Sequence, residues 1–178
     1  MILWTTQHQQ AAERMNETGT LRADEKHLLF DGSFIDSYRW MADQMKKRIG
    51  DPPEGMAFPV WAWYQWEGKR SRIDMRAHGW HWGEKGSPIV LLTFDAPDNH
   101  VLLSDFDYWH VVLNDGSLIF PFRETAVYTK DEKQKSWENI FDISCKHDGD
   151  EHFSLSTQAT LWEIKREWIV KEEHFISR

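Results

Sequence analysis

The segment PVWAWYQWEGKR, from Pro59 to Arg70, places four aromatic side chains within six residues and follows them with positive charge. Aromatic rings stack on flat ligands and a neighbouring cation can hold a phosphate, so this segment could bind a nucleotide. The alternative is an interior strand that is covered on both sides. Because strand side chains alternate, Trp61 and Trp63 share one face, and Tyr64 and Trp66 share the other. We expect Tyr64 and Trp66 in the main core, and Trp61 and Trp63 nearer a cleft.

Arg22 is a second candidate for ligand binding. The segment TGTLRAD places it just past Gly19, in an expected loop. An arginine there presents a planar fork that can bind phosphate oxygens. It can equally be an exposed loop arginine without a ligand, and the sequence leaves both interpretations open.

Acidic and metal-binding residue types also occur in suggestive places. Asp105 and Asp107 are spaced as a carboxylate pair, but acids in the first turn of a helix also favour the helix dipole, and we prefer that role. The segments RAHGWHWGEK and CKHDGDEH contain histidines and Cys145, yet neither has a spacing typical of structural zinc. We therefore expect no metal site and a structural role for Cys145.

These residues must be positioned by alternating strand and helix patterns, which predict one α+β domain over residues 1–178. Strands are expected at MILWTT, PVWAWYQW, SPIVLLTFDAP and SLSTQATLWEI. Helices are expected over 7–19, over 36–50, and over 104–116 with Ser104 as the N-cap. A shorter helix is expected at KSWENIFDI. The elements favour a central mixed or antiparallel sheet with flanking helices.

Composition narrows the class of protein. The chain has 178 residues, one cysteine and a net charge of -8. The acidic balance argues against a broadly basic nucleic-acid-binding surface, because phosphate contacts dominate that kind of affinity. No stretch approaches the apolar length of a membrane span, so we expect a cytoplasmic protein without membrane contact.

Four segments together resemble one bacterial family. MILWTTQ, WMADQMKKRIG, PVWAWYQWEGKR and VLLSDFDYWHVVLN look like the family known as domain of unknown function 3841, over nearly the whole chain. The family's description brings no activity with it.

A second resemblance concerns the two ends of the chain. LWTTQHQQAAERMNETGTLRAD is similar in layout to the opening of DarT-like ADP-ribosyltransferases, and TQATLWEI is similar to their late strand. This resemblance implies an ADP-ribosyltransferase-like fold and NAD as the cofactor. The family's first strand carries a histidine that helps to hold NAD, where this chain has Trp4, Thr5 and Thr6. The catalytic glutamate of the family's late strand is replaced by Thr160.

We therefore expect a domain that binds NAD or an ADP-ribose-like nucleotide in one cleft. The residues expected to line it are Trp4, Thr6, Arg22, Trp61, Trp63, Gln158 and Thr160. Arg22 would hold a phosphate, an aromatic ring would stack on a base or nicotinamide, and Gln158 and Thr160 would contact the ribose at the catalytic positions.

Two further questions stay open at this point. One is whether the domain is catalytic or binds the nucleotide without turnover. A catalytic domain would transfer ADP-ribose to a protein or nucleic acid, as a toxin would, and Asp105 or Glu138 would supply the missing acid. The other is a different class of function: a non-enzymatic interaction domain that holds a peptide, a protein or single-stranded nucleic acid on a Trp-rich surface.

Overall fold

The computed structural model describes residues 1–23, 34–75, 84–121, 126–144 and 155–178. The predicted positions His78, His81, Cys145, His147 and His152 lie outside these ranges. The elements, in chain order, are β1 (Ile2–His8), α1 (Gln9–Thr18), β2 (Thr20–Arg22), α2 (Ile35–Ile49), β3 (Val60–Gln65), β4 (Pro88–Asp95), β5 (Leu102–Asp105), α4 (Phe106–Leu113), α5 (Lys130–Ser136), β6 (Thr157–Leu161), β7 (Glu163–Lys165) and β8 (Ile169–Ile176).

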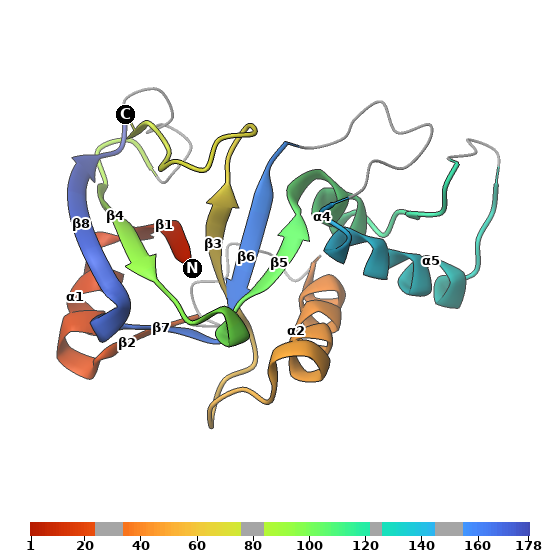
Figure 1. Cartoon of the computed structure of the whole chain (residues 1–178), viewed down its shortest axis with the longest axis horizontal. Coiled ribbons are helices and arrows are strands. Elements are labelled where there is room, and N and C mark those ends of the chain that lie inside the picture. The colour runs from red at the N-terminus through yellow and green to blue at the C-terminus, as the bar shows by residue number, and fades with distance from the viewer. Residues whose placement is uncertain (24–33, 76–83, 122–125, 145–154) are drawn as a thin grey trace.

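Six of the strands form one antiparallel sheet in the order β5-β6-β3-β1-β4-β8, and β2 pairs with β7 in a separate two-stranded sheet (Figure 1). Together with four helices in the described residues, this is the α+β domain with an antiparallel sheet that the sequence predicts. Helices α2, α4 and α5 gather beside the β5 edge, whereas α1 lies toward the β8 edge (Figure 1). None of the described helices is long and apolar enough to cross a membrane.

Helix α1 covers one face of the large sheet. Ala12 and Met15 are buried in a cluster with Leu3 and Leu92, which is the apolar pairing expected from their spacing. The helix ends at Gly19, whose φ of 82° is the left-handed conformation that favours glycine, and its N–H donates to the Met15 carbonyl at 2.8 Å. The predicted helix and its stop are confirmed.

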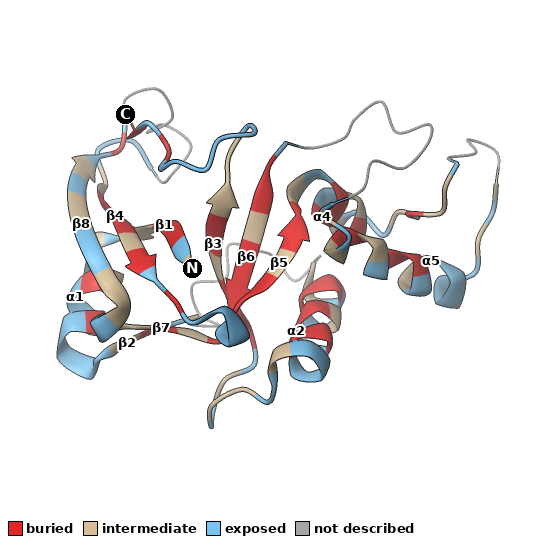
Figure 2. Ribbon diagram, in the orientation of Figure 1, coloured by how far each residue is buried: buried red, intermediate tan, exposed pale blue. Residues whose placement is uncertain are grey.

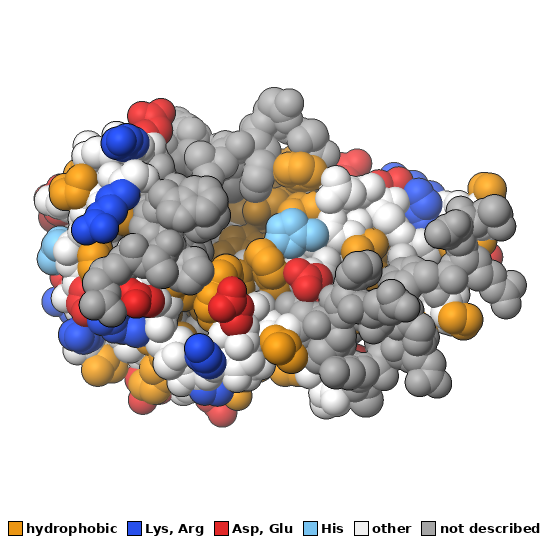
Figure 3. Space-filling model, turned by 90° about the horizontal axis from the view of Figure 1, so that it is seen from above, with side chains coloured by type: hydrophobic (Ala, Val, Ile, Leu, Met, Phe, Trp, Pro, Cys, Tyr) orange, Lys and Arg blue, Asp and Glu red, His pale blue; other side chains and the backbone are white. Residues whose placement is uncertain are grey.

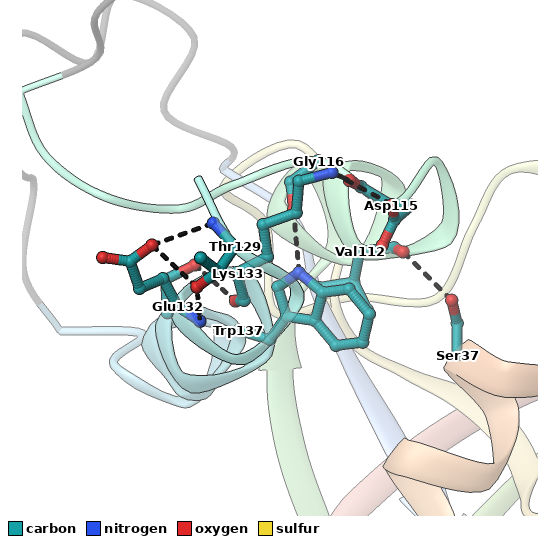
Figure 4. Close-up of polar contacts among 9 residues, drawn as sticks. Ser37, Val112, Asp115, Gly116, Thr129, Glu132, Lys133 and Trp137 are labelled. Atoms are coloured by element: carbon teal, nitrogen blue, oxygen red, sulfur yellow. Dashed lines mark hydrogen bonds and ion pairs between the residues drawn. The ribbon is translucent and has the colours of Figure 1, made fainter. Parts of the chain in front are cut away.

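A second cluster joins α2 and α4 at the β5 edge. Met41 and Met45 of α2 pack with Trp109 of α4 and with Trp137, which follows α5. Ser37 donates a hydrogen bond to the Val112 carbonyl at 3.0 Å and so ties α2 to α4 (Figure 4). Buried residues follow β3, β6 and β5 and the inner sides of these helices (Figure 2).

Polar contacts fix the chain after α4 (Figure 4). The Trp137 indole donates to the Gly116 carbonyl at 2.8 Å, and Lys133 reaches the Asp115 carboxylate at 3.0 Å. Helix α5 begins with a capping box between Thr129 and Glu132. The short helix predicted over 135–143 is therefore α5 followed by a 3-10 turn over Trp137–Phe141.

The N-cap of α4 is not the predicted Ser104. Asp105 caps the helix, because its carboxylate accepts the Tyr108 N–H at 2.9 Å. Ser104 lies opposite Gln158 in the β5–β6 ladder, so the strand continues through it and the helix begins after Asp105. Asp107 lies in the first turn, as expected.

Tyr64 is half-buried and packs against the α1 cluster, in line with the prediction, whereas the prediction that Trp66 belongs to this core is wrong. The ladder between β3 and β6 shifts register between Trp63 and Gln65, which breaks the simple alternation. The Trp66 ring therefore lies against Trp63, with ring centroids 4.5 Å apart, and is only half-buried. Val60 and Ala62 are the β3 residues buried in the α1 cluster.

Candidate functional site

Six of the seven predicted site residues share one face of the large sheet. The register pairs Trp4 with Trp63, Trp63 with Gln158, and Trp61 with Thr160. Paired residues in neighbouring strands point to the same side, and Thr6 follows Trp4 by two residues on that side. We call this set the aromatic face: Trp4, Thr6, Trp61, Trp63, Gln158 and Thr160.

Ser104 extends the aromatic face, and the sequence interpretation missed it. It pairs with Gln158 on the edge strand β5, so Ser104, Gln158, Trp63 and Trp4 form one row across four strands. The signal that would have revealed it is the pairing of β5 with β6, which cannot be read from either segment alone.

Several polar atoms of this face are buried without a hydrogen-bond partner among the described residues. They are Thr6 Oγ1, Trp61 Nε1, Ser104 Oγ and Gln158 Oε1. Ser104 has no exposed surface at all. A buried polar group without a partner costs about 1–3 kcal/mol, so such groups usually meet an ordered water or a ligand. Three of these atoms belong to neighbouring positions, because Ser104 is opposite Gln158 and Trp61 is diagonal to it.

Thr160 differs from these residues. Its side chain is completely buried, and its hydroxyl donates to the Leu102 carbonyl of β5 at 3.2 Å. The hydroxyl is thus already satisfied within the sheet.

Aromatic rings pack closely around the row. Trp63 contacts Phe106 with ring centroids 5.0 Å apart, and Trp61 lies 4.9 Å from Trp109. Trp4 and Trp63 are buried, in a cluster with Ile73. Protein atoms therefore cover much of the ring surface that a nucleotide base would need for stacking.

The surroundings of Trp61 are apolar as well. Tyr38 meets its ring edge to face at 5.9 Å. Burial raises the pKa of the Tyr38 hydroxyl to about 12, because the charged form would lose its hydration here. The region is one in which hydrogen bonds are stronger than in water.

The molecular surface is hollowed above this region. Seen from above, a depression lined by hydrophobic side chains, with a histidine at its rim, lies over the upper ends of β3 and β6 (Figure 3). Trp63 and Gln158 lie close to those strand ends.

Arg22 is placed elsewhere. It lies on β2, and its Nε and Nη2 bind Glu163 Oε2 of β7 at 2.9 and 2.8 Å. It lines a pocket of about 540 Å³ together with Ala11, Arg14, Thr18, Thr20, Leu21, Ala23, Gly55, Ala57 and Phe58. No residue of the aromatic face lines this pocket.

The two proposed acids do not reach the aromatic face. The Asp105 carboxylate is buried as the cap of α4, and its register partner Thr157 places it on the other side of β5 from Ser104. Glu138 is more than half exposed and pairs with Arg48 at 3.5 Å. In the described part of the chain, no group of three or more His, Cys, Asp or Glu side chains could hold a metal ion.

A family model described as "Domain of unknown function (DUF3841)" matches residues 2–119. The chain belongs to this family. The matched span runs from β1 through α4, and Gln158 and Thr160 lie beyond it. No curated protein and no solved structure matches the chain. The comparisons therefore give no support to the resemblance to DarT-like enzymes, which stays a prediction from two sequence segments.

Proposed function

We propose that this DUF3841 protein binds NAD or a related nucleotide, with the nicotinamide end on the aromatic face. The observation that carries the proposal is the set of neighbouring buried polar atoms without partners: Ser104 Oγ, Gln158 Oε1 and Trp61 Nε1. A ligand that satisfies them would recover the free energy that their burial costs.

The types of these atoms favour a carboxamide. An indole N–H can only donate, a glutamine Oε1 can only accept, and a serine hydroxyl does both. The carboxamide of nicotinamide has both an NH₂ donor and a carbonyl acceptor, so one planar group meets the complete set. The ring of Phe106, which is half-buried, would contact the attached pyridine ring.

The fold proposed with this function is that of ADP-ribosyltransferases. Its support is the order of elements at the start of the chain: β1, α1, the stop at Gly19, then β2. The strand β6, which carries Gln158 and Thr160, is separated from β1 by β3 alone.

Binding without turnover is the form of this function that we propose. The cross-strand neighbours of Gln158 are Ser104 and Trp63, and Thr160 donates its hydroxyl to the sheet. Neither arrangement supplies the carboxylate that would stabilise an oxocarbenium-like transition state.

The alternative of an interaction surface rich in tryptophan gains less support. Of the nine tryptophans in the described ranges, five are buried and four are half-buried. The large hydrophobic residues that are exposed there are aliphatic: Ile2, Val127, Leu155, Val170 and Ile176.

A ligand panel measured by thermal unfolding and calorimetry tests the proposal. NAD and free nicotinamide should raise the melting temperature and give saturable heats at millimolar concentrations. ADP-ribose lacks the carboxamide and should bind more weakly than NAD. Nicotinic acid has a carboxylate in place of the amide and provides the matched control, because it cannot donate to Gln158. Equal binding of nicotinamide and nicotinic acid, or no binding of NAD, would refute the proposal.

A further inference from the structure

The pocket that contains Arg22 has a composition different from that of the aromatic face. It lies between α1, β2 and the segment 55–58, and its volume of about 540 Å³ is in the range of small-molecule sites. Arg14 and Arg22 bring positive charge to its wall, and Leu21 and Phe58 are buried apolar side chains of its lining. We call it the Arg22 pocket.

An ion pair holds the guanidinium of Arg22 in place but does not occupy all of its N–H donors. Its Nε and Nη2 both bind a single oxygen, Glu163 Oε2, and the Arg22 side chain is 45% exposed. A guanidinium has five N–H donors in one plane, so others remain for a ligand. Glu163 is mostly covered, with 14% of its side chain exposed. The ion pair thus orients Arg22 at the pocket and partly neutralises it.

We propose that the Arg22 pocket is a second binding site, which takes a small molecule with an oxyanion, either carboxylate or phosphate, on an apolar body. The arginine fork matches both oxyanions in geometry and charge. Leu21, Ala57 and Phe58 would contact the apolar body. This inference does not depend on the nucleotide function, since the pocket shares no residue with the aromatic face.

The test is a titration of the full chain with four probes, followed in ¹⁵N spectra that include the arginine Nε–H groups. Phenyl phosphate and benzoate each carry one of the two oxyanions on a phenyl ring. Benzyl alcohol has the ring without the charge, and inorganic phosphate has the charge without the ring. At least one of the first two should bind and shift the Arg22 Nε–H, and which of them binds better identifies the oxyanion. Benzyl alcohol and inorganic phosphate should both bind more weakly.

Variants on the two sides of the ion pair should change affinity in opposite directions. Arg22→Gln should weaken binding of the better probe by about tenfold or more, the size of a lost charge-assisted contact. Glu163→Gln should strengthen it, because Arg22 loses a competing anion. Arg166→Gln is the matched control: this arginine is 46% exposed and pairs with Glu172 and Asn16, but does not line the pocket. Its affinity should equal that of the wild type.

A further variant does not alter any charge. Ala57 is exposed at the pocket wall, so Ala57→Trp should fill the space without disturbing the core and should weaken binding. Nicotinamide should not compete with the oxyanion probe.

The proposal fails if neither oxyanion probe binds, if benzyl alcohol binds equally well, if Arg22→Gln and Arg166→Gln behave alike, or if Glu163→Gln weakens binding.

Discussion

Ser104 and Thr160 are two buried hydroxyl residues on neighbouring strands with opposite hydrogen-bond situations. The Thr160 hydroxyl donates to the Leu102 carbonyl, whereas Ser104 Oγ has no partner in the described chain. Both are completely buried. The Thr160 hydroxyl thus stabilises the fold, whereas Ser104 Oγ is one of the atoms that the proposed function assigns to a ligand.

Substitution of the two hydroxyls should therefore have different effects on the free energy of unfolding. Ser104→Ala removes a buried group without a partner, so stability should stay the same or rise, by at most about 1 kcal/mol. Thr160→Val removes a hydrogen bond and leaves the Leu102 carbonyl without its partner, which should cost about 1 kcal/mol or more. Urea unfolding measures both. Equal losses in the two variants would show that Ser104 has a structural partner.

At the scale of single residues, the sequence indicated much of the aromatic face but not its neighbours. Strand alternation placed Trp61 with Trp63 and Gln158 with Thr160, and the sheet brings both pairs to the same side. The local sequence predicts Ser104 as a helix cap, because a serine before two acids is typical of one. Only the pairing of two distant segments shows that it belongs to the sheet.

At the scale of elements, the helices are predictable where apolar spacing and a following glycine agree, as in α1 before Gly19 and α2 before Gly50. Strand β8 was missed, because it is an edge strand with the charged sequence KEEH at its centre and lacks a continuous apolar run. The register shift after Trp63 was missed for another reason, since a bulge is a local backbone change with no fixed sequence signal.

The start of α4 gives a prediction at this scale. Asp105→Ala should cost about 1–2 kcal/mol, because the buried carboxylate caps the Tyr108 N–H. Asp107→Ala is the matched control, since Asp107 is an exposed acid in the first turn and should cost only a few tenths. Denaturant unfolding of both variants is the measurement. If Asp107→Ala cost as much as Asp105→Ala, charge at the helix start rather than the cap would be the source.

At the scale of the whole molecule, two strands of the large sheet come from the C-terminal part of the chain. Strand β6 lies between β5 and β3, and β8 forms the far edge beside β4. The family match ends before either of them. Both the fold and the aromatic face thus depend on residues beyond the matched span.

The second hydrophobic cluster gives a prediction for the stability of the whole domain at alkaline pH. Burial raises the Tyr38 pKa to about 12, above its value of about 10 in an unfolded chain. A raised pKa contributes stability that is fully present below pH 10 and is lost as the pH rises toward 12. The free energy of unfolding should fall by a few kcal/mol across this window. In the Tyr38→Phe variant, the free energy of unfolding should fall less over the same pH range. An equal fall in the variant and the wild type would show that other groups cause the pH dependence.

The proposed function requires a carboxamide to pair with the unpartnered polar atoms of the aromatic face. The most direct measurement is the ¹⁵N–¹H resonance of the Trp61 indole, assigned by its loss in Trp61→Phe and followed while nicotinamide is added. The indole N–H has no partner in the described structure, so its proton resonance should move downfield with saturation as it begins to donate to the ligand carbonyl. Nicotinic acid should not produce this shift, and Gln158→Leu should weaken it. A Trp61 indole resonance that stays fixed at saturating nicotinamide would contradict this binding mode.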